Sequence, residues 1–268
     1  MSPTIGELED TPLQSWGTLE YKPETDLLKP TVFFGLYSFN DFIAVWKHKG
    51  LKAILWAGSD IPRFINGYWL DESGKMRLDR RSLVKWISAN CENWAENKLE
   101  QQELKEVGIK AKVCPSFLGD VTKFEVSFVP GNKVYTSVSG NNFKLYGWNK
   151  ISKLAAKHKS VEFHLYGNTV KWGTDQKNVI VHGRVSQEQM NDDISVMQGA
   201  LRLNEHDGFS EILAKSILWG QWPVSLLEYP HMLRCDELGK ILKKKEPNLA
   251  GRQFYLDRLN NFPWNCHA

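Results

Sequence analysis

The sequence of 268 residues lacks a long apolar segment. Nowhere does it hold about 18 consecutive apolar residues, roughly the length that a helix needs to cross a bilayer. Its first ten residues, MSPTIGELED, are acidic and lack the basic start and apolar run of a secretory signal peptide. We therefore expect a cytoplasmic protein with no integral membrane segment.

Motifs for metals and redox cofactors are also missing. The four cysteines show no CxxC spacing and no metal-ligand pattern with the seven histidines, which favours free thiols. No Asp-x-Asp sequence occurs, and the adjacent Asp192 and Asp193 are expected on a solvated helix face. The absence of G-x-G-x-x-G after an early strand argues against a nicotinamide-dependent Rossmann enzyme. We expect neither a metal nor a cofactor.

What remains is the composition of an ordinary globular protein, 42% hydrophobic and 24% charged, with a net charge of +3. Short apolar runs alternate with helical periodicity along most of the chain, which predicts an α/β fold with parallel sheets. The pattern predicts, among others, a strand over 32–37, a helix over 98–107 and a basic helix over 236–245. Periodicity fades between residues 116 and 132. We therefore expect two domains, residues 1–125 and 126–268, the first beginning with an irregular, proline-rich arm over residues 1–30.

The most informative stretch runs from residue 200 to residue 225. An apolar strand over 200–203 leads into the polar turn His206-Asp207-Gly208, and apolar residues then recur at helical spacing up to Gly220. Such a turn lies at the carboxyl end of a buried strand and at the positive end of a helix. Open α/β sheets bind phosphate-bearing ligands there, so we expect a site near residues 207–211.

This stretch resembles the donor-site motif of retaining GT-B glycosyltransferases, in which an acidic residue, glycine, an apolar residue and a small residue open the helix and a Gly-x-Pro-Val-like segment follows it. The matching segments are 206–210 and 220–224. The resemblance covers most of the chain and is strongest over residues 179–225. It implies two Rossmann-like domains facing across a cleft and a metal-independent, hexosyltransferase-like enzyme. Its donor would be a UDP- or GDP-linked sugar, and its acceptor a hydroxyl group.

The resemblance also assigns roles to the turn. His206 and Asp207 would be catalytic, with Asp207 accepting hydrogen bonds from hydroxyls of the transferred sugar. The amides of Gly208, Phe209 and Ser210 would face the sugar or the diphosphate. The alternative is that Asp207 is only the N-cap of the helix.

One position departs from the family pattern. The family places a second acidic residue eight positions after the first, where it holds the ribose of the nucleotide, and this chain has Lys215 there. A cation cannot accept the ribose hydroxyl protons. Lys215 would then either reach a phosphate or leave the ribose to a group such as Glu211, unless it simply points to solvent.

Two further turns of the second domain are candidates for the donor site. The resemblance places Ser139 and Gly140 near the nucleotide and Lys144 on the diphosphate, although Lys144 could equally be an ordinary surface lysine. It places Arg184 and Val185 against the base, where Arg184 could stack on the base or pair with a phosphate. The alternative for Arg184 is the solvent edge of the preceding strand.

In the first domain, the strand over 52–56 ends in the turn Ala57-Gly58-Ser59-Asp60. The resemblance implies that such turns face the acceptor and the transferred sugar, with Gly58, Ser59 and Tyr37 on the acceptor side. Asp60 is a candidate general base or acceptor of sugar hydroxyl protons. Asp also favours turns and helix starts through its own local hydrogen bonds, so a structural role for Asp60 is the alternative.

Two questions of function stay open at the level of the sequence. A catalytically weakened nucleotide- or sugar-binding protein of the same fold is the main alternative, supported by Lys215. The acceptor could be a saccharide, a lipid-linked sugar, a protein side chain or a hydroxymethylated DNA base. A nucleic acid would favour a broad basic face, and Lys240 with Lys243, Lys244 and Lys245 forms one basic cluster.

Overall fold

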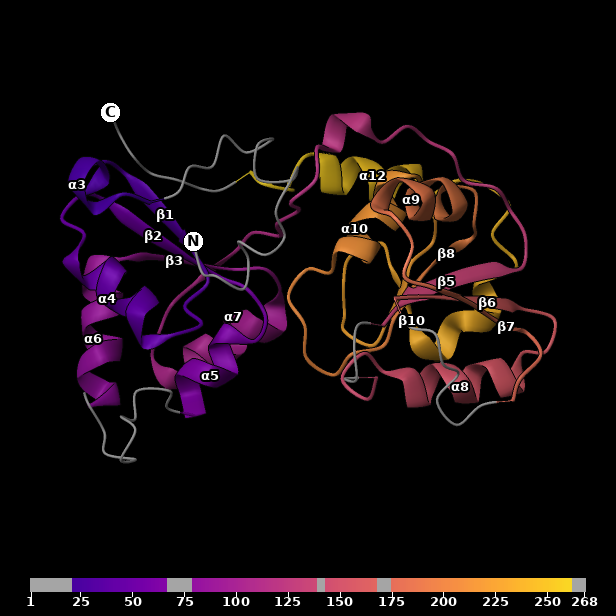
Figure 1. Cartoon of the computed structure of the whole chain (residues 1–268), viewed down its shortest axis with the longest axis horizontal. Helices are drawn as coiled ribbons and strands as arrows, with labels where there is room; N and C mark the ends of the chain where they lie inside the picture. Colours follow the sequence, from indigo (N-terminus) through magenta and orange to yellow (C-terminus); the bar gives the residue numbers. More distant parts are fainter. Residues whose placement is uncertain (1–20, 67–78, 139–142, 168–174, 262–268) are drawn as a thin grey trace. The chain divides into compact units, whose positions relative to one another are not determined.

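The computed structural model describes residues 21–66, 79–138, 143–167 and 175–261, and the chain divides into two compact units (Figure 1). Unit 1 consists of Met1–Asp120, His206–Phe209 and Leu259–Ala268, and unit 2 of Val121–Glu205 and Ser210–Arg258. Both units are α/β structures with parallel sheets, as the sequence predicts. The domain limits at residues 125 and 126 stay a prediction.

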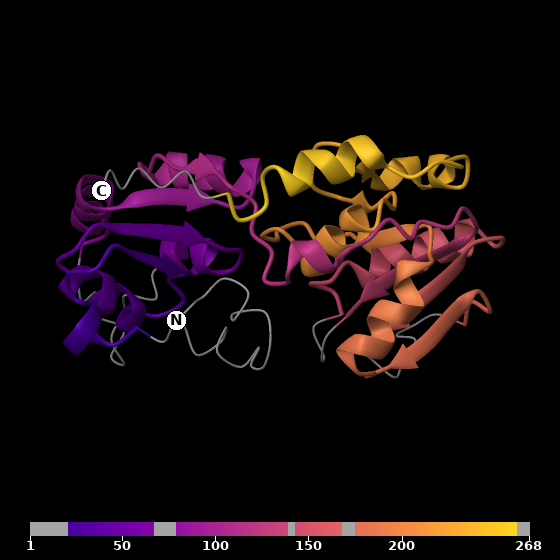
Figure 2. The ribbon, with the colours of Figure 1, turned by 90° about the horizontal axis from the view of Figure 1, so that it is seen from above.

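Unit 1 is built on a four-stranded parallel sheet in the order β1-β2-β3-β4 (Figure 2). The strands are β1 (Thr31–Phe34), β2 (Lys52–Trp56), β3 (Glu92–Ala95) and β4 (Lys112–Val113). The central strand β2 is an almost continuous apolar run, because both faces of a parallel sheet are covered. Because the strands are parallel, the carboxyl ends of β1, β2 and β3 meet at one edge of the sheet.

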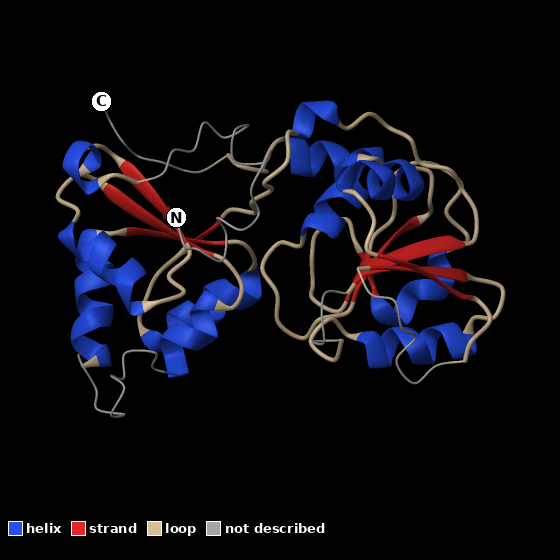
Figure 3. Ribbon diagram, in the orientation of Figure 1, coloured by secondary structure: helices blue, strands red, loops and turns tan. Residues whose placement is uncertain are grey.

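Four helices of unit 1 lie on one side of this sheet (Figure 3). They are α4 (Phe39–Lys47), α5 (Asp60–Asn66), α6 (Arg80–Asn90) and α7 (Lys98–Val107). Their apolar faces form one core with the sheet, in which the side chains of Ile54 and Trp56 from β2 are fully buried. The predicted helix over 98–107 is confirmed, while α5 was not predicted from the sequence.

Local signals set the ends of these elements. The side chain of Asn97 accepts the amide N–H of Glu100 at 3.0 Å and caps α7, and Gly108 ends the helix with φ 98°. The first strand was predicted over 32–37 but ends at Phe34. Gly35 adopts φ +73°, and a Cβ at that position would lie 2.1 Å from the ring of Tyr37, so the chain turns away from the sheet there.

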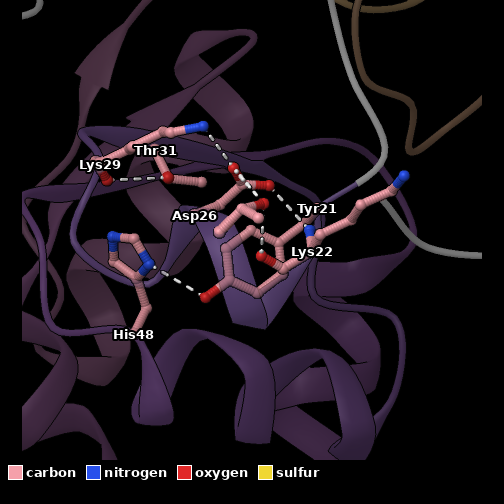
Figure 4. A network of polar contacts seen from close by, with 7 residues as sticks. Tyr21, Lys22, Asp26, Lys29, Thr31 and His48 are labelled. Carbon is pink, nitrogen blue, oxygen red and sulfur yellow. Dashed lines mark hydrogen bonds and ion pairs between the residues drawn. The ribbon is translucent and has the colours of Figure 1, made fainter.

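The arm before β1 is less irregular than predicted, because it contains the short helix α3 (Pro23–Asp26). Polar contacts stabilise this segment internally, and one joins it to His48 after α4 (Figure 4). The carboxylate of Asp26 accepts the amide N–H of Lys22 and an N–H of the Lys29 ammonium group, both at 2.8 Å. The Tyr21 hydroxyl lies 3.1 Å from Nδ1 of His48, and burial lowers the pKa of that histidine.

Unit 2 is built on a six-stranded parallel sheet in the order β10-β9-β8-β5-β6-β7. Its strands are β5 (Lys133–Ser137), β6 (Glu162–Tyr166), β7 (Val179–Gly183), β8 (Gly199–Arg202), β9 (Val224–Ser225) and β10 (Leu233–Arg234). Its helices are α8 (Trp148–Lys157), α9 (Gln187–Ser195), α10 (Glu211–Leu218), α11 (Leu238–Ile241) and α12 (Leu249–Leu256). Helices cover both faces, with α8 and α11 on one and α9, α10 and α12 on the other (Figure 1).

The basic segment near the end of unit 2 differs from its prediction. A helix was expected over residues 236–245, but α11 spans only Leu238–Ile241 and the lysines at 243–245 follow it. The buried apolar anchors of this segment are Leu238 and Ile241, so tertiary packing supports about one turn. Strand β10 was not predicted. Within the described part of the chain, no helix combines the length and the apolar character needed to cross a membrane.

Candidate active site

The turn His206–Phe209 follows β8 in the chain and belongs to unit 1. Side chains at the end of β3 and the start of α7 hold its backbone. Oε2 of Glu96 accepts the amide N–H of Phe209 at 2.9 Å, and the side-chain amide of Asn97 donates to the carbonyl of Asp207 at 2.8 Å. The backbone is thus attached on both sides of Gly208. The Phe209 N–H points at Glu96, not at the ligand that the sequence analysis assigned to it.

The side chain of Glu103, on α7, orients His206. Its Nε2 lies 2.8 Å from Oε2 of Glu103, and the two side chains are 27% and 26% exposed. A carboxylate on one ring nitrogen fixes the orientation of an imidazole and leaves the other nitrogen, here Nδ1, for a further hydrogen bond. The His206 side chain is thus partly open to solvent.

Two glycines allow the turns of unit 1 to approach one another. A Cβ on Gly208 would lie 1.9 Å from Oε2 of Glu96 and 3.3 Å from the amide nitrogen of Gly58. Gly58 itself adopts φ +74°, a conformation that side chains with a Cβ rarely take. The predicted turns at 58–60 and 206–209 therefore lie together within unit 1.

Asp60 is fully buried at the start of α5. Its two carboxyl oxygens accept the amide N–H groups of Leu36 at 3.0 Å and Ala57 at 3.1 Å, which ties the turn after β1 to the turn after β2. Burial raises the pKa of Asp60 to about 7, although these backbone hydrogen bonds oppose the rise. The role of Asp60 as a general base stays a prediction.

Two glutamates complete a cluster of buried carboxyl groups with Asp60. Glu100 is fully buried, and its oxygens accept the amide N–H groups of Gly58 at 2.6 Å and Glu96 at 2.8 Å. Burial raises the pKa of Glu96 to about 8 and that of Glu100 well above its usual range. The Ser116 hydroxyl donates to Oε1 of Glu96. The cluster thus carries protons near neutral pH.

The predicted acceptor-side residues surround the same turn. The Tyr37 hydroxyl donates to the carbonyl of Ala57 at 2.6 Å, and burial raises the pKa of that hydroxyl. Ser59 is exposed, while Gly58 is buried. Tyr37 therefore braces the turn after β2, and Ser59 is the member of the turn that faces solvent.

The predicted donor-side residues of unit 2 follow strands whose carboxyl ends share one edge of the sheet. Ser139 and Gly140 lie outside the described residues. Lys144 is exposed in the turn before α8, and after β7 Arg184 is exposed and Val185 half-buried. Parallel strands place such turns at the same edge, where α/β sheets bind nucleotides.

Helix α10 carries the rest of the predicted motif. Its N-cap residue is Ser210, so the interpretation of Asp207 as the N-cap is wrong. Glu211 opens the helix, and Nζ of Lys215 donates to Oδ1 of Asn191 on α9 at 3.0 Å. Burial lowers the pKa of Lys215, while the nearby Glu211 raises it. Lys215 therefore packs against α9 and does not simply point to solvent.

Comparisons with known proteins identify the fold. No family model matches the sequence, and no curated protein matches it. Among solved structures, the pneumococcal O-GlcNAc transferase GtfA, in complex with UDP and GlcNAc, is 12% identical and has a TM-score of 0.56; the match covers 88% of this chain and 55% of that one. The chain has the GT-B fold.

Two other GT-B structures show the same arrangement of elements. Anabaena Alr3699/HepE in complex with UDP is 13% identical, with a TM-score of 0.54 and coverage of 96% of this chain and 80% of that one. Sucrose-phosphate synthase from Thermosynechococcus elongatus is 10% identical, with a TM-score of 0.56 and coverage of 81% and 66%. The chain spans about half the length of GtfA and of S. aureus TarM.

Sequence reasoning missed several residues that this GT-B chain places near its predicted turns. In unit 2, the guanidinium group of Arg202 lies 4.7 Å from the ring centre of Tyr146, at the carboxyl end of β8 and beside the Lys144 turn. Arg202 escaped notice because it continues an apolar strand. In unit 1, Glu96 and Glu100 resemble the solvated acids of an amphipathic helix, and only their partners reveal their burial.

Within residues 21–66, 79–138, 143–167 and 175–261, no group of three or more His, Cys, Asp or Glu side chains is arranged to hold a metal ion. The oxygens of Asp60 and Glu100 already accept backbone N–H groups. Positive charge for an anionic ligand can come instead from Lys144, Arg184 and Arg202.

Proposed function

We propose that this chain is a glycosyltransferase that moves a sugar from a UDP-linked donor to a hydroxyl group of a saccharide, with retention of configuration and without a metal ion. The observation that carries the proposal is the turn at 206–209. It holds the residues of the family motif, and buried groups at the end of β3 fix it within a GT-B fold. The solved neighbours GtfA and HepE were captured with UDP, which favours UDP over other nucleotides.

In this proposal, unit 2 stabilises the leaving group. Negative charge grows on the diphosphate as the bond from its oxygen to the anomeric carbon breaks, and UDP leaves with the bonding electrons. Lys144, Arg202 and the amides at the start of α10 can stabilise that charge. Arg184 would stack on the base or pair with a phosphate.

The turn in unit 1 would bind the reacting sugar. Asp207 accepts hydrogen bonds from sugar hydroxyls, and His206, oriented by Glu103, presents Nδ1 to a substrate hydroxyl. The acceptor oxygen forms the new bond to the anomeric carbon, and its proton passes to the departing diphosphate oxygen of UDP. Ser59, in the adjacent turn after β2, and Tyr37, whose hydroxyl donates to that turn, are the proposed acceptor-side residues.

A panel of nucleotides and nucleotide sugars tests this proposal through thermal stabilisation of the full chain. UDP, UDP-glucose and UDP-GlcNAc should raise the melting temperature in a concentration-dependent way, because a ligand that binds only the folded state stabilises it. ADP and GDP should shift it less. Stabilisation by none of the uridine compounds would contradict the proposal.

A catalytically weakened UDP-sugar-binding protein is the second candidate, favoured by one observation. Lys215 stands where the family has a ribose-binding acid, and its Nζ is bonded to Asn191. That protein would be stabilised by UDP-sugars but would release no UDP from them with any saccharide acceptor or with water. Turnover therefore separates the two candidates.

A further inference from the structure

Glu96 binds the 206–209 turn directly and is linked to the turn after β2 through Glu100. Its side chain accepts the Phe209 N–H, and its own backbone N–H donates to Glu100, which also holds Gly58. Glu96 is only 6% exposed, so it is screened from bulk solvent by the turn that it holds. Burying a carboxyl group away from water costs free energy, so we expect Glu96 to have a role that offsets this cost.

We infer that Glu96 is a positioning residue for the proposed sugar transfer: its carboxyl group fixes the 206–209 turn so that the Asp207 side chain meets the substrate in one orientation. This inference rests on the proposed function. Asp207 lies between two anchors, its own carbonyl bound by Asn97 and the Phe209 N–H bound by Glu96. Loss of the second anchor would free the backbone on one side of Gly208. Small misplacements of a reacting group cost rate steeply.

The close packing of the turn supports this role. A Cβ on Gly208 would lie 1.9 Å from Oε2 of Glu96, so the backbone lies directly against the carboxyl group. The second oxygen of Glu96 receives the Ser116 hydroxyl, which restricts rotation of the carboxyl group. The Phe209 N–H and the Ser116 hydroxyl together fix the orientation of the Glu96 carboxyl group, and with it the position of the turn.

The charge on Glu96 bears on Asp207 as well. The titratable groups whose charge interacts with that of Glu96 include the acidic side chains of Tyr37, Asp60, Glu100, Cys114 and Asp207. A neutral Glu96 holds the turn without repelling the Asp207 carboxylate. An ionised Glu96 adds a negative charge beside it, and the shift of the pKa of Glu96 to about 8 reflects burial and this repulsion.

Two variants of Glu96 separate positioning from simple stability. In Glu96→Gln, the amide can still accept the Phe209 N–H and can donate to Ser116, so the anchor survives without a titratable proton. In Glu96→Ala the anchor is lost. An exposed glutamate of α7, changed in Glu106→Gln, is the matched control.

The experiment uses the full chain and follows hydrolysis of UDP-glucose and UDP-GlcNAc, with water as the acceptor, together with calorimetric binding of UDP. We expect Glu96→Ala to lower kcat about 100-fold while the Kd for UDP stays within about twofold. Glu96→Gln should keep most of the activity near pH 7. At about pH 9, where the wild type loses activity as Glu96 ionises, Glu96→Gln should retain it.

Two results would overturn the inference. One is a kcat of Glu96→Ala equal to that of the wild type, and the other is a Glu96→Gln variant that keeps the alkaline loss of the wild type. Since Glu96→Gln preserves the hydrogen bonds, the second result is informative even where Glu96→Ala does not fold. In both cases wild-type turnover would leave the proposed function intact.

Hydrogen exchange of the Phe209 amide distinguishes failure of the proposed function from failure of the inference. Faster exchange in Glu96→Ala than in wild type confirms the attachment of the turn independently of any substrate. If the wild type neither binds UDP nor hydrolyses the donors, the proposed function falls and the role in transfer falls with it. Unchanged exchange in a folded Glu96→Ala would contradict the attachment itself.

Discussion

Neighbouring carboxyl groups of unit 1 differ in what their oxygens contact. Asp60 and Glu100 bind backbone N–H groups on turns and are fully buried, whereas Asp207 is half-buried on the turn that Glu96 and Asn97 hold. A general base must reach a substrate proton. Asp60 would have to give up the N–H groups of Leu36 or Ala57 to do so. At the scale of single residues, Asp207 is therefore the better candidate for contact with substrate.

Replacement of Asp207 by Asn tests that role. Asn has the same size but no negative charge, so Asp207→Asn should fold normally and bind UDP with wild-type affinity. Its transfer rate should fall about 100-fold or more, in the range seen when a transition-state contact is removed. The rate of UDP release and a UDP titration measure the two effects. Asp192→Asn, an exposed change on α9, should alter neither, and full activity in Asp207→Asn would remove Asp207 from the site.

Arg202 offers a test of the diphosphate contact in unit 2. Its guanidinium group is held over the Tyr146 ring beside the Lys144 turn. Arg202→Gln should weaken UDP binding about tenfold and leave binding of uridine, which lacks the phosphates, unchanged. Lys153→Gln, on an exposed position of α8, is the control. Equal losses for UDP and uridine would indicate a structural role for Arg202 instead.

At the scale of elements, the sequence predicts best where local signals mark both ends. Helix α7 was predicted over its full length because Asn97 caps it and Gly108 ends it. Strand β1 was predicted too long because a single glycine inside an apolar run, here Gly35, does not show by itself whether the strand bulges or ends there. Helix α11 was predicted too long because the basic residues after it extend a helical pattern that packing does not support.

The buried carboxyl cluster lay beyond sequence reasoning for a physical reason. Glu96 and Phe209 are 113 positions apart, and no local pattern relates them. The acids at 96, 100 and 103 recur at helical spacing, which is typical of a solvated face. Their burial follows from the meeting of turns at the sheet edge. The resemblance singled out the turn at 206–209 but carried no information about the groups that hold it.

Gly208 tests whether the 206–209 turn needs its close approach to β3. In Gly208→Ala the new methyl group would overlap the Glu96 carboxyl group, so the turn must move, and overpacking of this kind costs about 1–3 kcal/mol. We expect a lower midpoint in chemical denaturation and loss of transfer. Gly239→Ala, where a Cβ meets nothing within 4 Å, is the control and should be neutral or slightly stabilising. A Gly208→Ala protein with wild-type stability would show that the turn is looser than described.

At the scale of the whole molecule, the cluster makes stability depend on pH. Asp60 and Glu96 have ordinary pKa values of 3.8 and 4.5, which burial raises to about 7 and about 8 in the folded chain. Between these limits the folded state binds more protons than the unfolded state, so the free energy of unfolding falls as pH rises from about 4 to about 8. Below about pH 4, the contribution of Asp60 and Glu96 to the free energy of unfolding is at its full value.

Denaturation midpoints at about pH 5 and about pH 9 check this dependence. The wild type should be more stable at the lower pH, and Glu96→Gln should show a smaller difference because one of the buried proton-binding groups is gone. Glu106→Gln should behave as the wild type. Stability that is flat or that rises over this range would contradict the burial of protonated carboxyl groups in unit 1.

The central claim is that this GT-B chain transfers sugar from a UDP-linked donor, and proton NMR of the reaction tests it most directly. UDP-glucose or UDP-GlcNAc would be incubated with the full chain and a set of saccharide acceptors. The account predicts release of UDP in proportion to protein concentration, a product whose anomeric configuration matches that of the donor, and loss of both signals in Asp207→Asn. Binding of UDP with no release from either donor, or release that Asp207→Asn leaves unchanged, would contradict it.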